Sequence, residues 1–291
     1  MKPLRIVTSE AGGGNDVPAR IVAQGLTLAL GQQVVIENRP SGVVPAEIVA
    51  KAAPNGYTLL FYNNALWTAP LIQATPYDML RDFTPVSAVA RAVNVLVVNS
   101  ALPAKSVAEL IALAKTKPGG LNYGSSGTGA SNHLAAEMFR TMAQIDIVRV
   151  NYRSNPAVVT DLIAGHIPMA IPDFNTGLPQ LKMQKVRALA VLTKERNRVL
   201  PEVPTLNETV MPGFDILAWA GMFGPANLPP EIVKVLADAV QKALSTPLVI
   251  ERLNAGGTEV FWSGPQEFSE FVKTELVKWT AAIKEAGIEP E

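Results

Sequence analysis

Residues 123–134 (YGSSGTGASNHL) combine residue types that suit the binding of an anion. The glycines let backbone N–H groups turn towards one point, and the hydroxyl side chains offer further donors. A helix predicted from Leu134 adds unpaired N–H groups and the positive end of its dipole. Such a site suits a carboxylate, sulfate or phosphate. An ordinary glycine turn capped by Ser131 or Asn132 is at least as good an interpretation of this stretch taken alone.

A second, similar stretch near the start of the chain favours the anion site. Residues 9–20 (SEAGGGNDVPAR) follow an apolar run at residues 4–7 and precede another predicted helix. Two units of strand, glycine loop and helix, so far apart in one chain, suggest two lobes that face one ligand. We expect Asp16 to cap the first helix and to act on a ligand only indirectly.

The composition of the 291 residues excludes several classes of function. Lys+Arg and Asp+Glu are both 25, and this zero net charge argues against a nucleic-acid partner. The absence of cysteine excludes disulfides and thiolate metal sites, and His133 and His166 are too few for most zinc sites. We expect no cofactor. No apolar run is long enough to span a bilayer. No secretion signal is visible, because residues 4–7 already suit a first strand; an exported protein would have lost its leader.

Alternating elements are expected to position the first glycine loop. The pattern predicts a helix at 17–30, a strand at 33–37, a helix at 46–53 and a strand at 57–62. This β-α-β-α-β order indicates a parallel sheet with ligands outside the carboxyl ends of its strands. A loop containing Asn64, Ala65 and Trp67 follows the last of these strands, so we include these three residues in the candidate site.

The pattern restarts after residue 100 and predicts a second α/β lobe. The C-terminal part is rich in predicted helices, with little sheet of its own, and most simply completes the first lobe. We predict a first lobe of residues 1–98 and 220–291 and a second lobe of residues 99–219. Two crossings, near residues 86–98 and 215–224, would make a hinge suited to closure around a ligand.

Motifs along nearly the whole chain resemble the substrate-binding proteins of tripartite tricarboxylate transporters, the Bug family. They occur in one order at residues 12–20, 30–40 (LGQQVVIENRP), 55–60 (NGYTLL), 76–78 with 82–83, 108–115, 187–191 and 201–206 (PEVPTL). The resemblance implies a periplasmic binding protein of the two-lobe Venus-flytrap type, with its leader removed. It also implies an organic-acid ligand in a cleft at the hinge and a membrane transporter as partner. We expect a monomer.

The resemblance also implies which residues hold the ligand. In the family, the first loop and a Ser-x-Gly-x-Gly region grip one ligand carboxylate; the matching positions are Ala11, Gly12, Gly13, Gly14, Ser126, Thr128, Gly129 and Ser131, with Asn132 beside them. Three departures are visible. Residues 41–44 (SGVV) replace the usual run of Gly and Ala, Ala130 replaces a hydroxyl residue, and residues 150–154 (VNYRS) replace a His/Val-Pro-Tyr-Lys-Gly segment. They leave the ligand open, but not the fold.

Further candidates follow from residue type and place. Asp173 ends a predicted strand, and we favour a role as acceptor for a ligand hydroxyl, amine or water over a turn cap. Trp67, Phe174 and Tyr152 suit an apolar wall of the cleft, although core packing is slightly favoured for any one of them. Arg153 could pair with a second carboxylate, although a solvated surface arginine is the more frequent case.

We expect different places and roles for the two histidines. His133, in the first turn of its helix, either donates to an anion or packs against the glycine loop, and the sequence favours neither. His166 follows a glycine in a predicted turn and is expected at the surface.

A binding protein fits the sequence better than an enzyme. A hydrolase that uses Ser125 or Ser126 lacks the Gly-x-Ser-x-Gly elbow. A nucleotide-binding enzyme lacks Gly-Lys-Ser/Thr and Gly-x-Gly-x-x-Gly. A ligand sensor that docks on a receptor shares all the residues of a transport protein and stays open. The apolar candidates favour a dicarboxylate or aromatic carboxylate over a highly hydroxylated acid.

Overall fold

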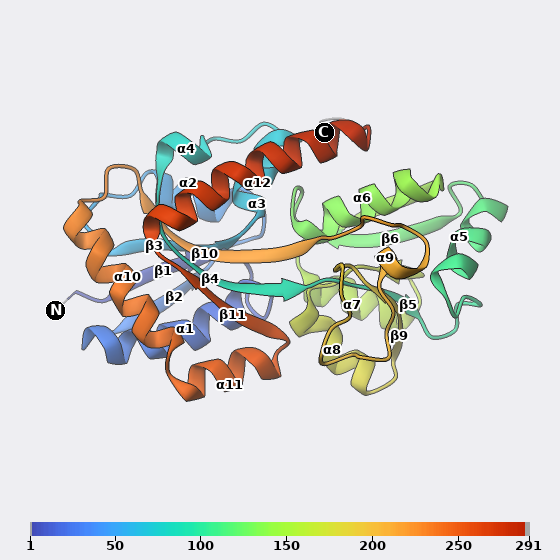
Figure 1. The fold of residues 1–291 in the computed structure, drawn as a ribbon, viewed down its shortest axis with the longest axis horizontal. Coiled ribbons are helices and arrows are strands. Elements are labelled where there is room, and N and C mark those ends of the chain that lie inside the picture. Colours follow the sequence, from blue (N-terminus) through green and yellow to red (C-terminus); the bar gives the residue numbers. More distant parts are fainter. Residues whose placement is uncertain (1, 289–291) are drawn as a thin grey trace.

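The computed structural model of the protein describes residues 2–288 and shows two β-sheets, each at the centre of one lobe (Figure 1). The strand order is β11-β4-β10-β3-β1-β2 in the first sheet and β7-β6-β8-β5-β9 in the second. Helices pack around both sheets, so the predicted two-lobe α/β fold is confirmed.

The chain begins in the first lobe. Its elements up to the first crossing are β1 (Leu4–Thr8), α1 (Asp16–Leu30), β2 (Val34–Asn38), α2 (Val44–Ala50), β3 (Thr58–Asn63), α3 (Ala65–Thr68), η1 (Ala69–Leu71), α4 (Met79–Asp82) and β4 (Phe83–Val93). β1 pairs in parallel with β2 and β3, as the alternation predicts. The loops that follow β1 and β3 therefore share one edge of the sheet. The predicted loop after β3 is partly the short helix α3.

The second lobe is built on strands of both directions. Its elements are β5 (Val95–Asn99), α5 (Val107–Thr116), β6 (Leu121–Ser126), α6 (Ser131–Ala143), β7 (Ile147–Tyr152), α7 (Asn155–Ala164), β8 (Met169–Ala170), α8 (Phe174–Lys182), β9 (Val186–Val191) and α9 (Leu206–Thr209). β6 is parallel to β7 and β8, whereas β5 is antiparallel to β8 and β9. The second glycine loop joins β6 to α6.

The chain then returns to complete the first lobe. The returning elements are β10 (Leu217–Pro225), α10 (Pro230–Leu244), α11 (Pro247–Ala255), β11 (Thr258–Ser263) and α12 (Pro265–Glu285). β10 lies antiparallel between β3 and β4, and β11 extends the sheet beyond β4. The sequence pattern predicts the three helices but not β11, so the C-terminal part contributes more sheet than expected.

The two crossings lie a few residues from their predicted boundaries. β4 ends at Val93 and β5 begins at Val95, so Asn94 is the first crossing. β10 begins at Leu217, paired with Val93, which places the second crossing beside the first. Residues 95–98, predicted for the first lobe, therefore belong to the second sheet. Residues 217–219, predicted for the second lobe, belong to the first.

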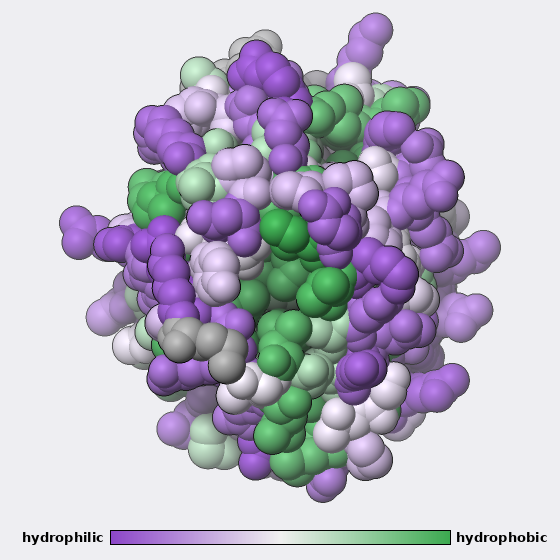
Figure 2. Space-filling model, turned by 90° about the vertical axis from the view of Figure 1, so that its left-hand side faces the viewer, coloured by the Kyte–Doolittle hydropathy of each residue, from purple (hydrophilic) through white to green (hydrophobic). Residues whose placement is uncertain are grey.

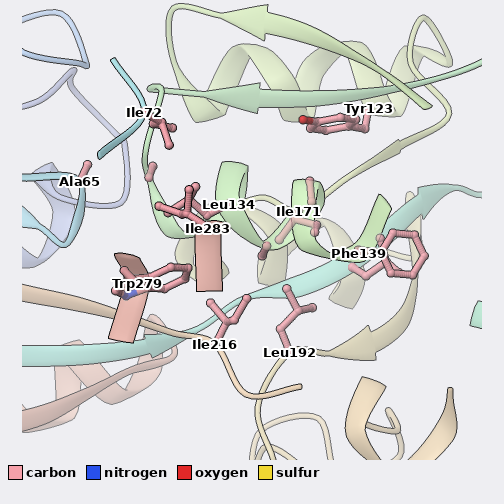
Figure 3. Packing of buried hydrophobic residues seen from close by; sticks show 14 of the residues in the cluster. Ala65, Ile72, Tyr123, Leu134, Phe139, Ile171, Leu192, Ile216, Trp279 and Ile283 are labelled. Carbon is pink, nitrogen blue, oxygen red and sulfur yellow. The ribbon is translucent and has the colours of Figure 1, made fainter. Parts of the chain in front are cut away.

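The hydrophobic core continues across the hinge. Trp279 and Ile283 of α12 belong to the same buried cluster as Leu134 and Phe139 of α6 (Figure 3). In Figure 1 the end of α12 reaches over the second lobe towards α6. The last helix is thus a third structural link between the lobes.

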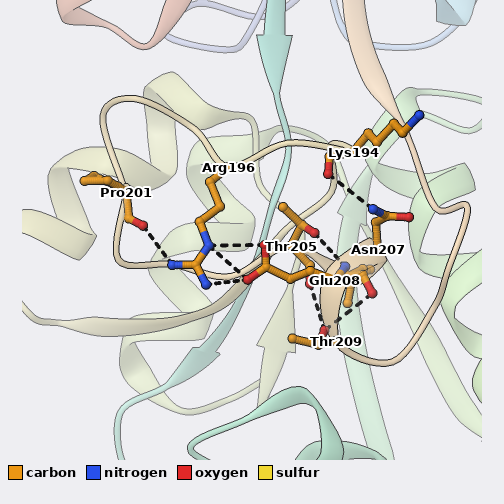
Figure 4. Close-up of polar contacts among 8 residues, drawn as sticks. Lys194, Arg196, Pro201, Thr205, Asn207, Glu208 and Thr209 are labelled. Atoms are coloured by element: carbon orange, nitrogen blue, oxygen red, sulfur yellow. Dashed lines mark hydrogen bonds and ion pairs between the residues drawn. The ribbon is translucent and has the colours of Figure 1, made fainter.

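Polar contacts fix the long connection between β9 and β10 (Figure 4). Arg196 donates from Nε to both oxygens of Glu208, at 2.9 and 3.1 Å, and from Nη1 to the Pro201 carbonyl at 3.1 Å. Thr205 caps α9 by accepting the Glu208 N–H at 2.8 Å. Val191 of β9 donates its N–H to the Pro204 carbonyl at 2.8 Å. The motif at residues 201–206 is therefore structural, because it ties this connection to the edge of the second sheet.

The end face of the first lobe, away from the second, carries a stripe of apolar side chains framed by polar ones (Figure 2). The first lobe also has a groove between α10 and the start of α12, lined by apolar residues that include Leu228, Val233 and Trp262. Among residues 2–288, no helix has the length and apolarity that a bilayer span requires.

Candidate functional site

A small chamber lies between the lobes, where the two glycine loops meet. It is lined from the first lobe by Ser9, Glu10, Gly14, Asn15, Ser41, Gly42, Tyr62, Asn63 and Ala65, and from the second by Ser126, Gly127, Thr128, Ala130, Asn155 and Asp173. Most of these side chains are polar and end on hydroxyl, amide or carboxyl groups. We call this space the inner chamber.

Two further spaces adjoin the inner chamber. A hinge-side chamber shares Gly14, Asn15, Asn63 and Asp173 with it and adds Asn94, Phe174 and Trp219, among others. An outer pocket shares Ser41, Gly42, Gly127 and Thr128 and adds Tyr152 and Arg153. The cleft thus runs from the hinge strands to the surface.

The second glycine loop packs directly on the first lobe. Gly127 and Gly129 have φ values of +72° and +80°, in the region that favours glycine. A Cβ on Gly129 would lie 2.5 Å from Cα of Ala69 in η1. Thr68 of α3 donates its hydroxyl to the Gly129 carbonyl. The structure is therefore closed around the cleft.

The first glycine loop is organised by Asp16. Its carboxylate accepts the Gly12 N–H at 2.8 Å, Nδ2 of Asn38 at 2.7 Å and Nε of Arg20 at 3.0 Å. Burial alone raises the pKa of Asp16, but these hydrogen bonds outweigh it and hold that pKa below its usual value. The N-cap position itself is Asn15, without a side-chain cap. Asp16 thus holds the loop in shape, but the prediction that it caps the helix is wrong, and its indirect role towards a ligand stays a prediction.

Most of the first loop does not line the inner chamber. Ala11 and Gly12 are exposed, and neither lines the inner chamber. The Gly13 N–H donates to the Glu10 carbonyl at 3.3 Å. Only Gly14 of the four predicted positions lines the chamber. The expectation that all four face the ligand is wrong for Ala11, Gly12 and Gly13, because the loop uses its own N–H groups to hold its shape.

Several other predicted residues do come together in the cleft. Ala65, Ser126, Thr128 and Asp173 line the inner chamber, and Phe174 lines the hinge-side chamber. Tyr152 and Arg153 lie at the outer pocket, where the Tyr152 hydroxyl donates to Asp161 at 2.8 Å. Arg153 is exposed, and no hydrogen bond or ion pair is recorded for it within residues 2–288. Their roles towards a ligand stay predictions.

Trp67 and Asn64 are not on the cleft surface. Both are fully buried, and the Trp67 ring packs edge-on to Phe223 at 6.4 Å in the core of the first lobe. The short helix α3 turns Trp67 inward, so its assignment to the cleft wall is wrong. His166, by contrast, is exposed beside Asp161, as expected.

Gly129 and the first turn of α6 make hydrogen bonds that hold the second glycine loop in place. Ser131 accepts Nδ2 of Asn94 at 3.1 Å, and the Asn132 side chain accepts the His133 N–H at 2.8 Å. His133 Nδ1 accepts the Gly129 N–H at 3.2 Å. Burial, and then the charge of Arg149, lowers the pKa of His133 to about 3. His133 is therefore neutral and packs against the loop. Gly129, Ser131 and Asn132 do not line the inner chamber, and their contacts with a ligand stay predictions.

Several polar residues of the cleft were not predicted from the sequence, among them Glu10, Asn155 and Asn94. Glu10 lines the inner chamber and accepts the Ser41 hydroxyl. Asn155, at the start of α7, donates Nδ2 to Asp173 at 2.5 Å. Asn94 lines the hinge-side chamber with its Oδ1 buried and without a hydrogen-bond partner. Two sequence signals could have indicated these cleft residues: Glu10 lies beside a glycine run, and Asn155 begins a helix.

The environment of Asp173 changes its protonation. Burial, followed by the nearby charge of Glu10, raises the pKa of Asp173 to about 7, against the lowering effect of the Gly14 N–H and Asn155. Half of these carboxyl groups are therefore protonated near neutral pH. Among residues 2–288, no cluster of three or more His, Asp or Glu could hold a metal ion.

This raised pKa predicts a pH-dependent stability. The folded protein keeps the Asp173 proton up to about pH 7, whereas an unfolded aspartate loses it near pH 4. The stabilising effect of the proton is thus fully present below about pH 4 and is lost as the pH rises to about 7. We expect the free energy of unfolding of the wild type, minus that of Asp173→Asn, to fall over this interval by up to ~4 kcal/mol and then to level off.

Urea unfolding of both proteins from pH 4 to 8 measures this difference. Other shifted groups, such as Asp16, cancel in the subtraction because both proteins contain them. A difference that does not vary with pH would show that Asp173 titrates normally in the folded protein.

Comparison with known proteins identifies the family of this chain. The family described as "Tripartite tricarboxylate transporter family receptor" matches residues 18–288. The structure of Rpa4515 from R. palustris with adipate is 33% identical, with a TM-score of 0.94 and 99% of both chains covered. MatC from Rhodopseudomonas palustris with bound malate is 27% identical, with a TM-score of 0.92 over 97% of this chain and 99% of its own.

A third structure, of the periplasmic binding protein BugD, is 27% identical and has a TM-score of 0.95, with 99% of both chains covered. The family assigned from the sequence motifs is therefore confirmed. The chain belongs to the tripartite tricarboxylate transporter receptor family, whose members are solute-binding proteins and not enzymes.

Proposed function

We propose that the protein captures a small organic acid in the cleft between its lobes and delivers it, from the periplasm, to a transporter of the tripartite tricarboxylate type. The observation that supports this most is the convergence of the second glycine loop, the start of α6 and the polar edge of the first lobe on one closed chamber. A helix N-terminus with glycine amides is suited to a carboxylate. Similar proteins hold adipate and malate.

In this proposal, Ser126, Gly127 and Thr128 receive the ligand carboxylate. Ser126 ends β6 and is buried, and Thr128 lies between the two positive-φ glycines, so the backbone fixes both hydroxyl groups. Arg149 donates to Ser125 at 2.8 Å and to Thr128 at 3.2 Å and places positive charge behind the loop. This charge favours an anion in front of it. Closure then excludes water from these contacts and strengthens them.

Binding of a panel of mono-, di- and tricarboxylates tests the proposed ligand class. Calorimetry and thermal shift report affinity, and the fluorescence of Trp219, which lines the hinge-side chamber, is expected to change on binding. Trp67 lies in the core and should change little. If no carboxylate binds, the proposal is contradicted. Uptake of the best ligand by cells that contain the transporter membrane subunits, with and without this chain, tests delivery.

Removing a donor from the second loop should weaken binding of that ligand. We expect Ser126→Ala and Thr128→Ala each to cost about 1–2 kcal/mol, roughly five- to thirtyfold in Kd, because a buried carboxylate loses a donor. Thr160→Ala, at an exposed position of α7 whose hydroxyl bonds only to Pro156, is the matched control. Calorimetry with unchanged affinity in both loop variants would place the carboxylate elsewhere.

Closure of the lobes predicts that a substitution can weaken ligand binding from a position that lines neither of the two chambers nor the outer pocket. Gly257, before β11, has φ +74°, and a Cβ there would lie 1.8 Å from Cδ1 of Phe174 in the other lobe. We expect Gly257→Ala to weaken binding about tenfold or more, because the added methyl group holds the lobes apart.

Gly213→Ala is the control for Gly257→Ala, since Gly213 also has a positive φ, +88°, but nothing within 4 Å of the added Cβ. Phe174→Ala removes the clash, so Gly257→Ala should cost little in that background. Equal losses with and without Phe174 would contradict closure through this contact.

A further inference from the structure

Asp173 of the second lobe carries a carboxyl group that touches the first lobe. A Cβ on Gly14 of the first glycine loop would lie 2.2 Å from Oδ2 of Asp173. The same oxygen accepts Nδ2 of Asn155 at 2.5 Å. Beside this contact, Asn175 donates Nδ2 to the Gly13 carbonyl at 3.4 Å, also across the cleft. The surroundings of this carboxyl group therefore depend on how closely the lobes approach each other.

The groups of the first lobe that face Asp173 offer it little positive charge. In the inner chamber, the other titratable lining residues are Glu10 and Tyr62. The Tyr62 hydroxyl donates to a backbone carbonyl at 2.7 Å, and burial raises its pKa, so it stays neutral. In the hinge-side chamber, Arg91 is held by Glu259 through hydrogen bonds of 2.8 and 2.9 Å. The first lobe thus brings the like charge of Glu10 towards Asp173.

The second lobe surrounds Asp173 mainly with neutral groups. Asn155 begins α7, and α8 has no charged residue before Lys182 in its last turn. Arg149 of β7 donates to Ser125 at 2.8 Å and so lies against the second glycine loop. Within the described part of the chain, amide groups and not an ion pair hold Asp173. A carboxyl group in such surroundings is more stable with its proton than without it.

Opening of the lobes would undo these surroundings. Glu10 and Gly14 would move away with the first lobe, and water would reach the carboxyl group, which then ionises near pH 4 as in a peptide. We propose that closure of the lobes takes up one proton at Asp173. The proton comes from the solvent, binds to the carboxylate as the lobes meet, and returns to the solvent when they separate. The closed form thus has a proton-binding site that the open form lacks.

The direction of the pH effect follows from the two protonation states. In the closed form, burial and then the charge of Glu10 raise the pKa of Asp173 to about 7. The proton therefore favours closure fully below about pH 4, and this effect is lost as the pH rises to about 7. Between these limits, each pH unit changes the ratio of closed to open molecules by up to tenfold. Under the proposed function, up to one proton would accompany each captured molecule.

A disulfide between the lobes provides the closed form without any ligand. The chain has no cysteine, and a Cβ on Gly127 would lie 3.9 Å from Cβ of Ser41 in the other lobe, a distance that suits a disulfide. In Ser41→Cys with Gly127→Cys, carbon-13 NMR of labelled aspartate follows the Asp173 carboxyl group, which Asp173→Asn identifies. We expect a titration midpoint near pH 7 in the oxidised form and near pH 4 in the reduced form. Asp238, exposed on α10, should titrate alike in both.

Gly257→Ala provides an open form without a disulfide, because its methyl group would meet Phe174 of the other lobe. The Asp173 midpoint should be near pH 4 in this variant. The proposal is overturned if the oxidised form titrates near pH 4, or if a midpoint near pH 7 persists in both the reduced form and Gly257→Ala. A midpoint that falls in either of these, while that of the oxidised form stays near pH 7, supports it. Since no ligand is present, failure of every carboxylate to bind would contradict the proposed function and leave this test unaffected.

Discussion

Close approach of the two lobes is the constraint on which the rest of this structure depends. At three contacts the approach is possible only because one partner lacks a side chain: Gly14 lies against the carboxyl group of Asp173, Gly129 against the backbone of Ala69, and Gly257 against the ring of Phe174. Elsewhere, hydrogen bonds join Thr68 to Gly129 and Asn175 to Gly13 across the cleft. Packing and hydrogen bonds between the lobes therefore form a closed state in which the polar residues of both lobes share one small space.

A closed state of this kind has an electrostatic cost that a ligand can remove. Closure buries Asp173 near Glu10, and the high pKa of Asp173 expresses this cost. A ligand shifts the equilibrium towards closure only by the difference between its affinities for the closed and open forms. A ligand that contacts residues of both lobes at once has such a difference, because an open form cannot offer it both sets of contacts together.

The two glycine loops look alike in the sequence but have different tasks in the structure. Both follow a strand and precede a helix, and this local pattern made their positions predictable. The hydrogen-bond partners of their N–H groups were not predictable. The Gly12 N–H donates to Asp16, and the same carboxylate also accepts a hydrogen bond from Asn38 of the next strand. Residues 95–98 were assigned to the first lobe because composition alone does not show that the apolar run at 93–98 changes sheets at Asn94. β11 was missed because it is a strand only through its pairing with the distant β4.

The same contrast between local pattern and long-range contacts decides which site residues were predictable. Ser126, Thr128 and Asp173 were predictable because each stands at or just after the end of a strand, where the fold class alone indicates a ligand. Glu10, Asn94 and Asn155 become cleft residues only when segments far apart in the chain are brought together. Trp67 shows the converse error, since an aromatic side chain beside a binding loop can serve the core behind it. Of the two roles that the sequence left open for His133, packing against the loop is the one described by its hydrogen bond with Gly129. In a two-lobe protein the strand ends locate the cleft, but its charge depends on residues that meet only on closure. The family motifs therefore indicate a carboxylate, whereas Glu10, to which no family motif assigned a ligand contact, lines the chamber only because the fold brings it there.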